Sequence, residues 1–126
     1  MPAIHEDALQ IVGAFGITAE AAKEFSIPEP VLDDMADLVP LLPPGFTIPE
    51  IEVDEDDGIV VARWFSADMR ESFSITFPGL GTITAYHSRA FPDPAWKMAL
   101  VDKARLMAKL SEASLTSLIC PKVSTR

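Results

Sequence analysis

Apolar positions in the first part of the chain recur every three or four residues, the spacing of an amphipathic helix. One such stripe consists of Ala8, Leu9, Ile11, Val12 and Phe15. Gly16 follows it and can adopt the positive φ with which many helices end. Thr18 can cap a second helical segment that runs to Glu24 or Phe25, before Pro28 interrupts the chain. The pattern therefore predicts two short helices here.

A third helix is predicted from Pro30 onward. Its apolar stripe consists of Val31, Leu32, Met35, Leu38 and Val39. We expect Asp33, Asp34 and Asp37 on the opposite side of this helix, in its early turns, where carboxylates favour the positive end of the macrodipole. The helix ends at a stiff connector that contains Pro40, Pro43, Pro44 and Gly45.

Between residues 46 and 90 the apolar period changes to two, which is the spacing of strands. Ile51 and Val53 alternate with acids, and a turn at residues 54–58 leads into a returning strand at 59–65. Strict alternation recurs at 72–77 and 82–87, on either side of a turn at 78–81. The pattern predicts a four-stranded antiparallel meander with one apolar face and one face rich in Ser and Thr.

Alternation also separates the two faces of the returning strand. Val60, Ala62 and Trp64 share one face, so Trp64 is expected in the core. The other face carries Ile59, Val61, Arg63 and Phe65, near Tyr86 of a later strand. This apolar strip either packs against the N-terminal helices or marks a partner site, and we favour packing against the helices.

Residues 95–118 are predicted to form one C-terminal helix that covers a sheet face, although the pattern from Ser111 to Cys120 is ambiguous. Lys103 interrupts its apolar stripe, and the aliphatic stem of a lysine can lie along apolar surface. The stripe consists of Trp96, Ala99, Leu100, Leu106, Met107 and Leu110. The predicted architecture is one α+β domain over 1–126, with a helical acidic part at 1–45, the sheet at 46–90, this helix at 95–118 and a tail at 121–126.

Length and composition are consistent with that architecture. The chain has 126 residues, of which 48% are hydrophobic and 23% charged, as expected for one globular core. It contains no apolar run of about 20 residues, and its first ten residues are acidic where a signal peptide is basic. We expect a soluble, cytoplasmic protein with no membrane association. Cys120 is the lone cysteine, so we expect an incidental thiol and no metal or other cofactor.

Charge is distributed unevenly between the two halves of the chain. Residues 1–60 contain fourteen acids and one lysine, a net charge of −13, whereas residues 61–126 contain five acids and nine bases, a net charge of +4. A surface this acidic repels phosphate, so direct nucleic-acid binding is not expected. The acids either keep a small domain soluble or form a surface that occupies a basic groove of a partner.

Two clusters could carry chemistry. Asp54 and Asp56 alternate before Gly58, as at the start of a calcium loop, but an EF-hand requires Gly at its sixth position and Glu at its twelfth, and here Gly58 is fifth and the twelfth is Phe65. A Ser/His/Asp site could combine His87 and Asp93 with Ser72 or Ser88. However, no G-x-S-x-G elbow presents a nucleophile, so a surface histidine is expected instead and no catalytic residue is assigned.

The segments Pro49–Asp54 and Asp57–Val60, together with Trp64 and the Ser-Ile-Thr strand, resemble a pattern found in small uncharacterised bacterial and phage proteins. This likeness covers roughly a third of the chain and carries no known activity. In size, acidity and lack of a catalytic motif the chain is also similar to phage-borne inhibitors of CRISPR effector complexes. That second similarity is one of general character and implies a protein that blocks a nucleic-acid-handling complex.

We therefore hypothesise a non-enzymatic module that binds a protein partner with a basic surface. The expected contacts are Asp33, Asp34, Asp37, Asp54, Glu55, Asp56 and Asp57. Two alternatives remain. One is a small hydrolase or transferase with a site near His87. The other is an accessory module that forms a homodimer through the face that carries Ile59, Val61 and Phe65.

Overall fold

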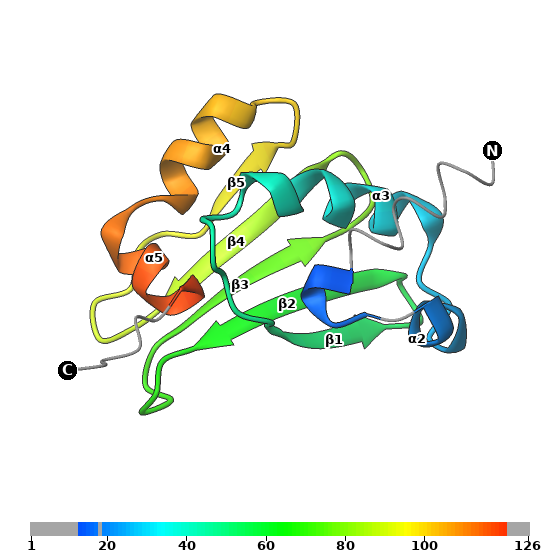
Figure 1. Ribbon diagram of the computed structural model, residues 1–126, viewed down its shortest axis with the longest axis horizontal. Coiled ribbons are helices and arrows are strands. Elements are labelled where there is room, and N and C mark those ends of the chain that lie inside the picture. The colour runs from blue at the N-terminus through cyan, green and yellow to red at the C-terminus, as the bar shows by residue number, and fades with distance from the viewer. Residues whose placement is uncertain (1–12, 18, 121–126) are drawn as a thin grey trace.

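The computed structural model describes residues 13–17 and 19–120, and it has an α+β fold in which helices pack on a five-stranded antiparallel sheet (Figure 1). The N-terminal elements are the 3-10 turn η1 (Gly13–Phe15) and the helices α2 (Ala19–Glu24) and α3 (Glu29–Leu38). A second 3-10 turn, η2 (Val39–Leu41), leads into the sheet. Most of the predicted first helix lies outside the described residues. Gly16 does adopt a φ of 81°.

Four strands form where strict alternation predicts them. They are β1 (Glu50–Asp54), β2 (Ile59–Phe65), β3 (Ser72–Phe77) and β4 (Thr82–Ser88), and neighbouring strands pair in chain order. The register places Ala62 opposite Ile75, and Ile75 opposite Ala85. The buried residues of each strand therefore share one face of the sheet.

The C-terminal region differs from the single helix predicted at 95–118. Trp96–Ala99 form a fifth strand, β5, which pairs antiparallel with β4 and turns Trp96 and Met98 toward the core side of the sheet. Two helices follow, α4 (Lys103–Leu110) and α5 (Ala113–Ile119), separated at Ser111 and Glu112. Met107, expected on the apolar stripe, is exposed. Four residues are too few to distinguish a period of two from one of 3.6, which explains the wrong prediction.

The core lies between the sheet and the helices. Phe15 is fully buried, and its ring lies 6.4 Å from that of Trp64 and 6.0 Å from that of Phe77. Trp64 stacks on Phe73, and its indole N–H donates a 2.8 Å hydrogen bond to the carbonyl oxygen of Thr47. The prediction of Trp64 as a core residue is therefore confirmed.

The second face of the sheet is not covered by any helix in the described part of the chain. Because Ile51 and Val53 share the core side of the sheet with Val60 and Ala62, α2 packs on the same face as α4 and α5. Tyr86 stays 44% exposed on the other face. The expectation that the N-terminal helices cover the strip of Ile59, Val61, Arg63 and Phe65 is therefore wrong for α2, and the first predicted helix lies mostly outside the described residues. These four side chains are half-buried.

No helix within the described ranges is long and apolar enough to cross a membrane.

Candidate functional site

The β1–β2 turn presents three consecutive acids to solvent. Glu55, Asp56 and Asp57 are exposed, and the backbone closes beneath them because the Gly58 N–H donates a 2.8 Å hydrogen bond to the Asp54 carbonyl oxygen. The Asp54 carboxylate accepts a hydrogen bond of 3.3 Å from the Asp57 N–H. Asp54 therefore shapes the turn, while Glu55, Asp56 and Asp57 remain exposed.

This acidic turn lies directly beside the start of α3. Gly58 has a φ of 67°, and a Cβ at that position would come within 2.9 Å of Cγ of Pro28, the residue that precedes α3. Glycine is favoured here for two reasons: L side chains avoid this positive φ, and a Cβ would collide with Pro28. Two segments about thirty positions apart in the sequence are thus joined at one edge of the molecule.

The exposed acids of α3 follow a different spacing from the one predicted. Asp33 is half-buried and Asp37 is exposed, whereas Asp34 is only 7% exposed. Glu29, which was not among the expected contacts, is exposed and lies one helical turn before Asp33. Glu29, Asp33 and Asp37 succeed one another at intervals of four residues, or about 6 Å along the helix axis.

The prediction that Asp34 lies on the outer side of α3 is wrong. Its carboxylate accepts a 3.0 Å hydrogen bond from the backbone N–H of Gly81, in the β3–β4 turn. Burial raises the pKa of Asp34, the Gly81 hydrogen bond opposes that rise, and the charges of Asp37 and Asp33 add to it. Asp34 therefore anchors the helix to the sheet and is withdrawn from the solvent-facing acids.

We call the remaining acids the acidic face, defined as Glu29, Asp33, Asp37 and the turn residues Asp54, Glu55, Asp56 and Asp57. The first sixty residues do contain a paired acid, since Glu52 lies 2.9 Å from Arg63. By contrast, no ion pair within the described residues neutralises Asp33, Asp37 or the turn acids. At Asp33, Asp37 and the turn, the acidic face therefore presents carboxylates without basic partners among the described residues.

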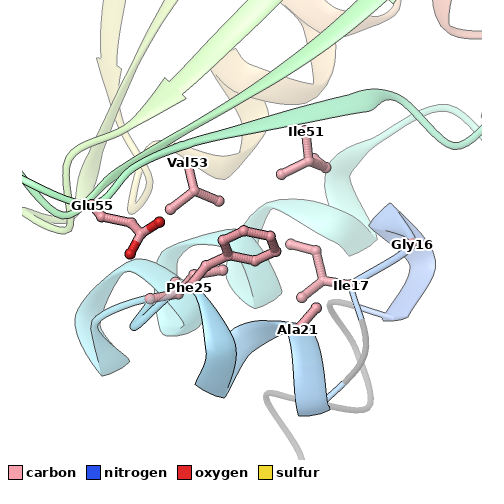
Figure 2. Close-up of a pocket in the computed structure, with 8 residues that line it drawn as sticks. Gly16, Ile17, Ala21, Phe25, Ile51, Val53 and Glu55 are labelled. Atoms are coloured by element: carbon pink, nitrogen blue, oxygen red, sulfur yellow. The ribbon is translucent and has the colours of Figure 1, made fainter.

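An apolar pocket of about 240 Å³ opens between α2 and β1, close to the acidic turn (Figure 2). Its apolar lining consists of Ile17, Ala21, Phe25, Ile27, Ile51 and Val53. Glu55 lies at one end of this row of side chains and Gly16 at the other. Phe25 is 40% exposed, which is unusual for a phenylalanine that lies among other apolar side chains. The sequence offered only one sign of this pocket, an aromatic residue at the end of a short helix.

His87 is buried, although a surface histidine was predicted. Its side chain is 3% exposed, its Nε2 lies 2.7 Å from Oε2 of Glu71, and its Nδ1 lies 3.4 Å from Oδ2 of Asp93. Arg89 donates two 3.0 Å hydrogen bonds to Asp93 and, as the largest cause, lowers the pKa of that carboxyl. The structure thus brings His87 and Asp93 together, as one hypothesis required.

The serines proposed as nucleophiles lie elsewhere. Ser72 and Ser88 pair with each other in the register next to the pair of Phe73 and His87, so their side chains point to the opposite face of the sheet. A shallow cleft of about 420 Å³ beside the histidine is lined by Glu71 and Arg89, among others. The arrangement joins two loops around a buried imidazole, and neither of the two serines proposed as nucleophiles lies beside it.

Cys120 has no activating partner among the described residues. Its Sγ lies 3.6 Å and 3.5 Å from the carbonyl oxygens of Pro43 and Pro44, and burial raises the pKa of the thiol. A raised pKa reduces the thiolate fraction and hence the nucleophilicity of a cysteine. The described side chains of His, Cys, Asp and Glu form no group of three or more that could hold a metal ion.

No protein-family model matches this chain, and no curated protein or solved structure is significantly similar to it.

Proposed function

We propose that this protein is a small, non-enzymatic binding module that docks its acidic face on a basic surface of a protein partner. The observation that supports the proposal is the close approach of Gly58 to Pro28, because it sets the turn beside the start of α3, the helix that carries Glu29, Asp33 and Asp37. Scattered acids would serve solubility equally well. Acids brought together from two segments, with Asp33, Asp37 and the turn acids lacking basic partners among the described residues, favour a function in recognition.

The partner that fits this surface best is a complex that handles nucleic acid. Regularly spaced carboxylates on a helix present a row of negative charges to a basic groove, as a phosphate backbone does. Their attraction to the groove acts over a range set by ionic strength. Docking there would exclude the nucleic acid. The proposed role is therefore an inhibitor of the general kind represented by phage-borne inhibitors of CRISPR complexes.

Self-association is the second candidate function. The observation that favours it is the second sheet face, where Tyr86 is 44% exposed on β4 and Ile59, Val61 and Phe65 form a half-buried strip on β2, with β3 between them. Light scattering of the purified protein separates the two candidates, because docking on a basic partner requires no homodimer. The enzymatic alternative near His87 has less support, since Ser72 and Ser88 face away from the imidazole.

The proposal is tested by reversing charges within and outside the acidic face. One variant carries Asp37→Lys, Glu55→Lys and Asp56→Lys. The matched control carries three lysines at exposed acids elsewhere, namely Glu50, Asp102 and Glu112. Each variant changes the net charge by +6, from −9 to −3.

Partner capture from the native cell is then compared among the wild type and the two variants. We expect the wild type and the control to retain the same partner and the first variant to lose it, since only the first variant removes the acidic face. Equal loss of the partner by both variants would show that net charge, and not this face, determines binding, and full retention by both would show that this face is not required.

A further inference from the structure

We propose that the pocket between α2 and β1 receives one large apolar side chain from a basic segment of the partner. This inference rests on the proposed function and deepens it, because it specifies the anchor of the docking surface. The acidic face alone accounts for attraction to any basic surface. An apolar pocket beside it adds a requirement for an apolar group at a defined distance from positive charge.

The size and lining of the pocket suit such a side chain. Its volume of about 240 Å³ exceeds the roughly 150 Å³ in which an engineered apolar cavity binds benzene. The floor is formed by Ile51 and Val53 of β1, which is an edge strand, and one wall is formed by Ala21 of α2 and by Phe25, which directly follows that helix. A leucine or phenylalanine from outside would therefore contact apolar side chains on the floor and on this wall.

The charges around the pocket determine the character of its occupant. Glu55 lines the pocket itself, and Asp56 and Asp57 follow it in the same turn. Glu20 and Glu24 are exposed on α2, whose only base is Lys23. An apolar group flanked by acidic residues would be repelled from this site, whereas one flanked by lysine or arginine would be attracted. Charge complementarity thus selects a basic segment with one apolar anchor.

The test uses two synthetic peptides as probes. Both are short and lysine-rich; one has a central leucine, and the other has serine in its place. Binding to the full-length protein is measured by isothermal titration calorimetry at low ionic strength. We expect the leucine peptide to bind about ten- to a hundredfold more tightly, the effect of burying one such side chain. Its addition should also shift the methyl NMR signals of Val53.

Two variants and a control assign that preference to the pocket. Ala21→Leu fills the pocket, and Phe25→Ala removes one wall; each should bring the leucine peptide close to the affinity of the serine peptide. Ala104→Leu, at an exposed position of α4, introduces the same side chain elsewhere and should leave the preference unchanged. Circular dichroism confirms that each variant is folded, and the use of two pocket variants keeps the test decisive if one is not.

The outcomes separate this inference from the proposed function. If neither peptide binds, the acidic face does not recognise basic segments and both proposals fail. If both peptides bind with equal affinity, the acidic face is supported and the pocket inference is overturned. Nuclear Overhauser effects between Val53 and residues 1–12 of the free protein would also overturn it, because the chain itself would then occupy the pocket.

Discussion

Replacement of Asp34 tests whether this residue anchors the fold or belongs to the docking surface. The carboxylate is almost fully buried and accepts a hydrogen bond from the Gly81 N–H, which ties α3 to the β3–β4 turn. Alanine removes the acceptor and leaves that N–H unpaired. Asparagine keeps an acceptor oxygen in the same place and removes the charge.

The expected magnitudes follow from opposing contributions. A hydrogen bond to a charged group contributes about 1.5–3 kcal/mol, and desolvation of the carboxylate together with repulsion from Asp33 and Asp37 offsets part of it. We expect Asp34→Ala to lower the free energy of unfolding by about 1–2 kcal/mol at neutral pH. Asp34→Asn should lie within about 0.5 kcal/mol of the wild type, since it keeps the bond without the buried charge.

The dependence on pH follows from the raised pKa of Asp34. Because the folded protein binds this proton more tightly than the unfolded chain does, the contribution of Asp34 is fully present below its unfolded pKa and is lost as the pH rises through its folded pKa. The wild type should therefore gain stability relative to Asp34→Asn as the solution is acidified.

Urea denaturation of the three proteins at acidic and neutral pH measures these differences. Two results would refute the reasoning. One is equal destabilisation by alanine and asparagine, which would assign no role to the hydrogen bond. The other is a stability difference between the wild type and Asp34→Asn that does not change with pH, which would show that folding does not raise the pKa of the Asp34 carboxyl.

Three further predictions concern other contacts. Gly58→Ala should lower the free energy of unfolding by more than Gly81→Ala in urea denaturation; both residues have positive φ, which costs about 1–2 kcal/mol in an L residue, but only the Cβ at position 58 meets a neighbour. His87→Phe should lower the free energy of unfolding by about 2–3 kcal/mol in the same assay, because Glu71 loses its hydrogen bond to the imidazole; an unchanged stability would show that His87 has no structural role. Cys120 should be alkylated more slowly at neutral pH when folded than in urea, because burial raises its pKa; equal rates would contradict this.

Much of the sheet could be predicted because its strands bury alternate residues. The Ser-Phe-Ser-Ile-Thr-Phe run of β3 buries every second side chain, so sequence and structure agree residue by residue. β5 was not predicted because Trp96–Ala99 is short and lies next to a helix with an apolar stripe of its own. The face against which α2 packs could not be predicted, since alternation reveals two faces and does not show which of them a distant helix covers.

The candidate site was predictable in its charges and not in its geometry. The acids of the turn are evident in the sequence, but their position beside α3 depends on the contact of Gly58 with Pro28, which only the fold creates. Asp34 and His87 were assigned to the surface because polar side chains usually lie there. Each is buried because it has found a partner on another segment, Gly81 for the first and Glu71 for the second.

Competition with nucleic acid tests the central claim most directly. The partner captured by the wild type is bound to a fluorescently labelled nucleic acid and titrated with the wild type, the variant with Asp37→Lys, Glu55→Lys and Asp56→Lys, and the matched control. We predict that the wild type and the control displace the nucleic acid at low salt, less effectively as salt is raised, and that the charge-reversed variant does not. Displacement by all three proteins alike, or by none of them, would contradict the proposal that the acidic face occupies a basic groove.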